Sequence, residues 1–162
     1  MAKRQVFFSF HFNNDVMRVQ QIRNIGVIEG NTPVTSNNWE DIKRNGEAAI
    51  QRWINTNMQN KSCVIVLIGS ETASRKWVKY EIKKAWEDGR ALLGIYIHNI
   101  NCPRNGKSTK GSNPFNTYNI DGVSMADIVP CYNPSSNNAY NDIANNIDSL
   151  IEKAITIRNG YA

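Results

Sequence analysis

Two side chains with the potential for chemistry, Trp77 and Glu81, stand four residues apart, shortly after a buried strand. The sequence around them predicts a helix over 74–88, and positions four apart share one face of a helix. The preceding run CVIVLI, at 63–68, is apolar and rich in β-branched residues, which is typical of a strand buried on both faces. We therefore expect the pair just beyond the carboxyl end of a strand, where open α/β sheets bind ligands.

An indole beside a carboxylate at this place favours cleavage of a bond between a sugar and a planar base. The indole of Trp77 can stack on a nicotinamide or adenine ring. The carboxylate of Glu81 can stabilise the oxocarbenium-like transition state of such a cleavage. A structural alternative stays open, in which Trp77 packs in the core and Glu81 is a solvated residue paired with a lysine. Spacing alone favours that alternative.

Several common nucleotide and hydrolase motifs are missing from the chain. It has no GxGxxG after its first strand and no GxxxxGK[ST], so neither a Rossmann nor a P-loop phosphate site is supported. It has no GxSxG turn of a serine hydrolase. A phospho-acceptor receiver would need acidic residues where this chain has Ser9-Phe10-His11 and Gly69-Ser70.

The chain alternates strands and helices over its whole length. Strands are predicted at 5–10, 63–68, 91–97 and 127–131 with a short one at 27–28, and helices at 15–25, 39–58, 74–88 and 138–158. This order predicts one α/β domain over 1–162, a flavodoxin-like three-layer sandwich around a central, mainly parallel sheet. Trp39 and Trp53 are expected to pack rather than to contact a ligand. The polar segment 101–124, with an Asn105-Gly106 turn, is the longest insertion.

Composition points to a soluble cytoplasmic protein. A net charge of +5 suits an anionic small molecule, while the scattered basic residues give little reason to expect nucleic acid. Three cysteines without a CxxC pair fit a reducing compartment, and two histidines, His11 and His98, make a metal site improbable. No apolar stretch is long enough for a transmembrane helix, so we expect no membrane partner.

The run Ser70-x3-Ser74-x2-Trp77-x3-Glu81-Ile82 resembles the SxxxxSxWCxxEL signature of TIR domains, and VFFSF at 6–10 resembles their first strand. Three segments are more closely similar to the TIR-like ThsB proteins of bacterial Thoeris antiphage systems: MAKRQVFFSFHF, CVIVLIGSETASRKWVKYEI and GKSTKGSNPF. The resemblance covers residues 1 to about 116, and the region after about residue 119 is not matched. Val78 stands where the signature has Cys, which can alter local packing.

This resemblance implies an enzyme that consumes NAD+ as its substrate, without a separate cofactor. The products would be nicotinamide and a cyclic or otherwise modified ADP-ribose, a messenger that activates an effector protein after a phage-derived trigger. Glu81 would be the catalytic glutamate, and Trp77 would stack on the nicotinamide or on the second nucleotide. The pocket at the end of the first strand would be lined by Phe8, Ser9, Phe10 and His11. Assembly with other TIR domains is a further implication.

Charged residues of the long insertion can complete such a site. Lys107 and Lys110, with Arg104 nearby, can neutralise a diphosphate, although loop lysines are more often simply solvated. Two functions of other classes stay open: a TIR adaptor that only assembles with other TIR domains, and a sensor that binds a nucleotide without turning it over. The adaptor predicts that Glu81 is dispensable, and the sensor predicts binding without release of nicotinamide.

Overall fold

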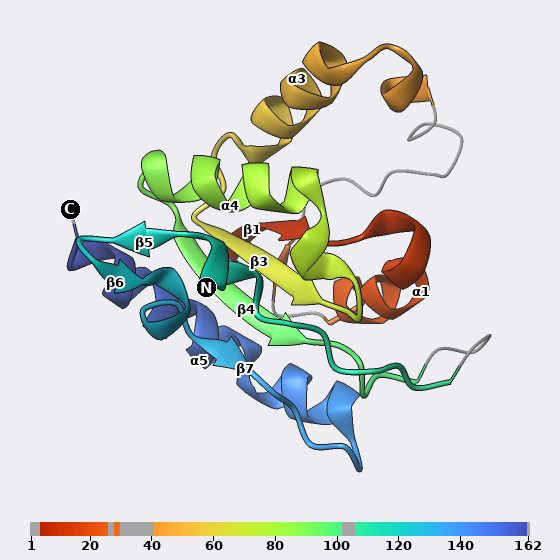
Figure 1. Ribbon diagram of the computed structural model, residues 1–162. Coiled ribbons are helices and arrows are strands. Elements are labelled where there is room, and N and C mark those ends of the chain that lie inside the picture. Colours follow the sequence, from red (N-terminus) through yellow and green to blue (C-terminus); the bar gives the residue numbers. More distant parts are fainter. Residues whose placement is uncertain (1–3, 26–27, 30–40, 102–105, 162) are drawn as a thin grey trace.

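A sheet of five parallel strands, in the order β2-β1-β3-β4-β7, runs through the middle of the protein (Figure 1). The computed structural model describes residues 4–25, 28–29, 41–101 and 106–161, and of residues 12–16 and 28–29 the backbone alone. The strands are β1 (Arg4–Ser9), β2 (Ile28–Glu29), β3 (Cys63–Ile68), β4 (Ala91–Tyr96) and β7 (Cys131–Tyr132). This arrangement confirms the predicted flavodoxin-like α/β class.

Helices cover both faces of this sheet (Figure 1). One face carries α1 (Phe12–Arg23) and α5 (Ala139–Asn159), and the other carries α3 (Glu47–Met58) and α4 (Lys76–Glu87). All residues of β3 and β4 are buried, as a continuous apolar run in a doubly covered sheet predicts.

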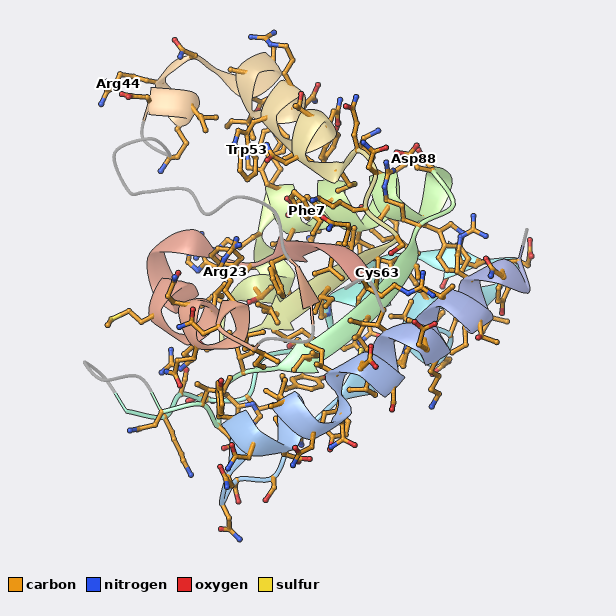
Figure 2. The ribbon with its side chains drawn as sticks, turned by 180° about the vertical axis from the view of Figure 1, so that it is seen from behind. Phe7, Arg23, Arg44, Trp53, Cys63 and Asp88 are labelled. Carbon is orange, nitrogen blue, oxygen red and sulfur yellow. The ribbon has the colours of Figure 1, made fainter. Side chains whose placement is uncertain are left out.

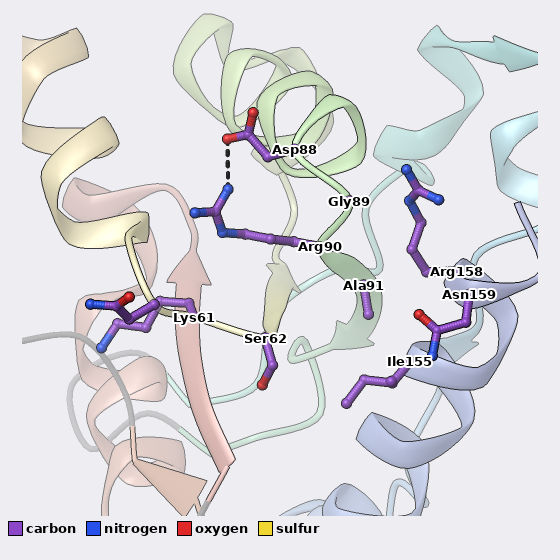
Figure 3. A pocket seen from close by; sticks show the side chains of 10 residues that line it. Lys61, Ser62, Asp88, Gly89, Arg90, Ala91, Ile155, Arg158 and Asn159 are labelled. Carbon is purple, nitrogen blue, oxygen red and sulfur yellow. Dashed lines mark hydrogen bonds and ion pairs between the residues drawn. The ribbon is translucent and has the colours of Figure 1, made fainter. Parts of the chain in front are cut away.

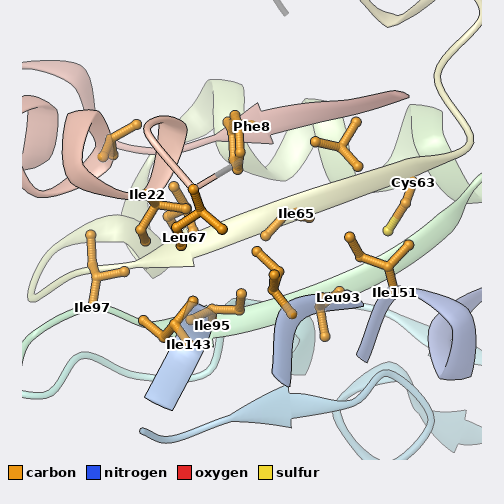
Figure 4. Close-up of a cluster of buried hydrophobic side chains, with 14 of the residues drawn as sticks. Phe8, Ile22, Cys63, Ile65, Leu67, Leu93, Ile95, Ile97, Ile143 and Ile151 are labelled. Carbon is orange, nitrogen blue, oxygen red and sulfur yellow. The ribbon is translucent and has the colours of Figure 1, made fainter. Parts of the chain in front are cut away.

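Alternation along the strands divides the core into two clusters. Phe8 and Ile65 face α1 and α5, where Ile22 and Ile143 meet them (Figure 4). Phe7 points to the opposite face and packs edge-on against Trp53 of α3, with ring centroids 6.1 Å apart (Figure 2). The expectation that Trp53 has a packing role is confirmed, while Trp39 lies outside the described residues.

The predicted helix over 39–58 is wrong in its continuity. Residues 41–44 are helical, but the helix is interrupted at Gly46, and α3 starts only at Glu47. Gly46 has a φ of +91°, a left-handed conformation that glycine adopts without the clash of a Cβ. Apolar periodicity continues across the break, which is why the sequence pattern alone did not reveal it.

The region after β4 also differs from its prediction. Residues 125–127 form a short 3-10 helix, η3 (Met125–Asp127), and the last strand is only Cys131–Tyr132, not 127–131. The Pro130 carbonyl accepts a hydrogen bond from the Gly94 amide at 2.9 Å, so pairing with β4 begins there. The insertion contains an unpredicted hairpin, β5 (Asn119–Ile120) and β6 (Val123–Ser124), while Asn105 of the expected turn lies outside the described residues.

Among the described residues, no helix has the combination of length and hydrophobicity that crossing a bilayer requires.

Candidate active site

A hydrogen bond between Ser9 and Glu81 lies at the centre of the candidate site. The Ser9 hydroxyl donates to Oε1 of Glu81 at 2.7 Å, and the two residues are 0% and 7% exposed. Ser9 is the last residue of β1, and Glu81 lies on the sheet-facing side of α4, whose other buried residues are all apolar. The alternative in which Glu81 is a solvated residue paired with a lysine is therefore wrong, because the carboxyl group is buried and its partner is a serine.

Burial changes the acidity of this carboxyl group. Removal from water raises the pKa of Glu81 from 4.5 to about 8, and the hydrogen bond from Ser9 opposes part of that rise. At neutral pH most of the population is then protonated in the absence of a ligand. A positively charged ligand group beside Glu81 would favour the ionised form, so binding of a cation and ionisation of this residue are coupled.

Helix α4, which carries Glu81, is held on both sides by long-range hydrogen bonds. The Tyr80 hydroxyl donates to Oδ1 of Asn55 on α3 at 2.9 Å. From the other side, the Tyr118 hydroxyl donates to the Lys79 carbonyl at 3.0 Å. Because both anchors lie within two residues of Glu81, they limit its movement relative to the end of β1.

Trp77 lies one turn before Glu81 on α4, as the spacing predicts. Its ring is half-buried, packs partly against the apolar cluster of this face, and meets Tyr80 edge-on at 5.5 Å. The Lys76 ammonium lies 5.2 Å from its ring centroid. One portion of the indole thus packs in the protein and another portion is exposed, while stacking on a substrate ring stays a prediction.

The loop after β3 is shaped by a buried threonine. Thr72 is fully buried, and its hydroxyl accepts from the Gly69 amide at 2.8 Å and donates to the Leu67 carbonyl at 3.4 Å. Gly111 of the long insertion lies against this turn so closely that a Cβ there would come within 2.0 Å of the Gly69 oxygen. The insertion therefore crosses the carboxyl end of β3. Ser9 pairs with Val66 of the same strand, three residues before Gly69, so the crossing lies close to Ser9.

Two histidines stand at the same edge of the sheet. His11 follows β1, and burial together with the Arg75 guanidinium lowers its pKa. His98 follows β4, and burial together with the Lys110 ammonium lowers its pKa. Nδ1 of each ring is buried and has no hydrogen-bond partner among the described residues. Each histidine thus keeps a buried ring nitrogen that has no partner in the described part of the chain.

The structure brings some of the predicted binding residues together and separates others. Lys110 stays at the carboxyl edge, with its Nζ 4.7 Å from the Tyr96 ring centroid. Lys107 reaches away from it and donates to the Ser136 carbonyl, 2.5 Å away, in the loop before α5.

Phe8 and Phe10 lie on the far side of the sheet from Glu81. Phe8 is 2% exposed in the cluster facing α1 and α5, with the Arg23 guanidinium 5.2 Å from its ring centroid, and Phe10 packs against that same cluster. The prediction that Phe8 lines the pocket with Ser9 is therefore corrected, because successive strand residues point to opposite faces. This alternation was visible in the sequence.

Sequence reasoning missed Thr72, Gly111 and the site-edge position of His98. Only His98 had a usable signal, since it directly follows the predicted strand over 91–97. The close contact of Gly111 with Gly69 depends on the path of the insertion, which no local pattern reports. The described part of the chain contains no cluster of three or more His, Cys, Asp or Glu side chains able to hold a metal ion.

Comparison with known proteins adds independent findings. Residues 7–101 match the family model described as "Thoeris protein ThsB, TIR-like domain". The chain is also 40% identical over 134 residues to a protein of Bacillus cereus (strain MSX-D12) named "Putative cyclic ADP-D-ribose synthase ThsB1", an alignment that covers 77% of this chain and 69% of that protein. The family-model match includes the end of β1 from residue 7 together with β3 and α4, and therefore both Ser9 and Glu81.

Proposed function

We propose that this chain, which belongs to the TIR-like domain family of Thoeris ThsB proteins, is an enzyme that cleaves the nicotinamide–ribose bond of NAD+ and makes a cyclic ADP-ribose. The observation that carries the proposal is the buried, serine-bonded Glu81 at the carboxyl edge of the parallel sheet. In this proposal NAD+ is the substrate and no further cofactor takes part.

The properties of Glu81 suit the first chemical step. The nicotinamide ring of NAD+ carries a positive charge, so its approach would lower the pKa of the carboxyl group and favour the carboxylate. As the bond from C1 of the ribose to nitrogen breaks, its electron pair leaves with nicotinamide and positive charge develops on the sugar. A carboxylate in a water-poor site stabilises that charge strongly. The Ser9 hydroxyl holds the carboxyl group in place through its 2.7 Å hydrogen bond.

The second step decides the product. A nucleophile from the same molecule, held near C1, would attack the cation, lose a proton and close a ring, whereas water would give linear ADP-ribose. Exclusion of water favours ring closure. The insertion across the carboxyl end of β3 can supply that exclusion, since Gly111 lies directly on Gly69. In this arrangement Lys110, at the carboxyl edge, is the cation closest to hand for the diphosphate of the substrate.

The wider role follows from the family. We propose that the nucleotide product activates a separate effector protein, that a phage-derived signal starts its synthesis, and that the protein acts in the cytoplasm, where NAD+ is available. Assembly with further TIR domains would be one way to switch the enzyme on. These partners rest on family membership rather than on the geometry of the site.

The decisive test is nicotinamide release from NAD+ by purified protein, with and without lysate of phage-infected cells. Glu81→Gln should abolish release, because the amide keeps the size and the hydrogen bond but carries no charge. The matched control is Glu87→Gln on the same helix, since that side chain is exposed and only 3.9 Å from Lys83 in a surface ion pair. Mass spectrometry would distinguish a cyclic product from linear ADP-ribose, which is heavier by one water.

Three results would contradict the proposal. Release that survives Glu81→Gln would mean that another group performs the chemistry. A protein that releases nothing under any condition, while Glu81→Gln still protects cells from phage, would indicate an adaptor. Binding of NAD+ without release would indicate a sensor.

A further inference from the structure

A pocket lies at the edge of the sheet opposite to Glu81, where the strands begin. It has a volume of about 360 Å³ and lies beside the starts of β3 and β4, with Ser62, Arg90 and Ala91 in its wall (Figure 3). The last turn of α5 contributes Arg158 and Asn159. A strand of six residues spans about 20 Å, so this amino-edge pocket is remote from Ser9 and Glu81 at the carboxyl edge.

Positive charge exceeds negative charge in the wall of the amino-edge pocket. Its cationic residues are Lys61, Arg90 and Arg158, and its one acidic residue is Asp88. Asp88 is already engaged, because it accepts from Arg90 at 2.6 Å and from Lys84 at 2.9 Å. Lys61 and Arg158 are therefore left without a counterion in the described part of the chain.

The partners that the structure gives Lys61 and Arg158, among the residues it describes, are all neutral. The Lys61 ammonium is 3.3 Å from Oε1 of Gln5. Arg158 donates from Nη2 to the Trp86 carbonyl at 2.9 Å, and its guanidinium lies 4.5 Å from the Trp86 ring centroid. Within the described residues, neither cation has a carboxylate at ion-pair distance.

The negative carboxyl ends of nearby helices explain only part of this clustering of cations. The carboxyl ends of α4 and α5 lie here, and cations near such ends are stabilising. The bond from Arg158 to the Trp86 carbonyl is of that kind. However, the Nε atoms of both Arg90 and Arg158 are buried and meet no acceptor among the described residues. A buried guanidinium N–H without an acceptor is unfavourable, so the protein alone does not fully satisfy these two cations.

We propose that the amino-edge pocket binds a small phosphate-bearing anion. Guanidinium groups match the oxygens of a phosphate in charge and geometry, and Lys61 adds a point charge. The volume falls in the range of about 300–1,000 Å³ that is usual for small-molecule sites, so a phosphate group with a short organic remainder fits. This site is separate from NAD+ cleavage and does not depend on the function proposed above.

The test is a titration of the full chain with inorganic phosphate, pyrophosphate and ribose 5-phosphate at constant ionic strength. Calorimetry would measure the binding, and the NMR chemical shifts of the backbone amides would locate it. We expect saturable binding that moves the amide signals of Ser62, Gly89 and Asn159 and leaves that of Ser70 in place. Inorganic phosphate as the best ligand would identify a free-anion site, and ribose 5-phosphate as the best ligand would identify a site for a phosphorylated metabolite.

Charge variants locate the binding. Lys61→Met and Arg158→Met should each weaken it at least tenfold, while Lys153→Met, which removes an exposed positive charge elsewhere on α5, should not change it. Arg158→Met also removes the stacking on Trp86, so its fold is checked by circular dichroism, and Lys61→Met keeps the test decisive if that variant fails. Absence of saturable binding in the parent protein, or equal weakening by Lys153→Met, would overturn the proposal. Retained binding in Glu81→Gln is expected, because the two sites are independent.

Discussion

Replacing Glu81 by Gln should stabilise the protein and flatten its dependence on pH. Burial raises the pKa of Glu81 from 4.5 to about 8, so the folded protein holds this proton more tightly than the unfolded chain does. The contribution of the group is fully favourable below the unfolded pKa and is lost as pH rises through the folded pKa. Ionisation of Glu81 therefore opposes folding increasingly from about pH 4.5 to about pH 8.

The magnitude follows from the two pKa values. At about 1.4 kcal/mol per pKa unit, a rise from 4.5 to about 8 corresponds to a loss of about 3 kcal/mol at pH 7 and somewhat more at pH 9. Gln has no proton to lose and can still accept the hydrogen bond from Ser9. The variant should thus gain stability over the parent as pH rises, in the manner of other active-site residues that are held at a cost to folding.

Urea unfolding of both proteins near pH 5, 7 and 9 would measure this difference directly. Taking the difference between parent and variant cancels the other titrating groups, and Glu87→Gln controls for the loss of one carboxyl group at an exposed position on α4. Parallel stability–pH curves for the parent and Glu81→Gln would refute the reasoning, because they would show that Glu81 titrates as it does in water. The result does not depend on the activity of the enzyme.

Further predictions concern the groups around Glu81. In Ser9→Ala the pKa of Glu81 should rise further, so nicotinamide release at pH 7 should fall about tenfold and recover at alkaline pH; an unchanged pH profile would contradict this. Gly111→Ala should destabilise the protein by about 1–3 kcal/mol in urea unfolding, because its Cβ would collide with the Gly69 oxygen, and no loss would mean that the loop lies elsewhere. Arg18→Met should cost about 1–3 kcal/mol in the same assay, since this buried guanidinium donates to two backbone carbonyls at 3.1 and 2.8 Å around the start of the insertion. A stability equal to the parent's would show that water replaces those bonds.

Local sequence patterns were sufficient to predict the elements that have a strong apolar periodicity and clear turn residues at their ends. The apolar run at 63–68 is β3, and the helix predicted over 74–88 is α4, which starts two residues later and ends one residue earlier. The prediction failed where no clear helix-ending signal was present. At Gly46 a left-handed backbone interrupts a pattern that otherwise continues as a helix. The short strand β7 was displaced because its position is set by pairing with β4 and not by its own sequence.

The sequence by itself determined the α/β class, the position of Glu81 on a helix after a buried strand, and the family motifs that surround it, because all of these depend on residues close together in the chain. The tertiary structure decided what Glu81 is: its partner Ser9 lies 72 residues away, and its raised pKa comes from burial between α4 and the sheet. It also decided that Phe8 faces away, that Lys107 reaches toward α5, and that Lys61 and Arg158 share one pocket. Solvent exclusion and long-range contacts set these properties, and neither is encoded in local spacing.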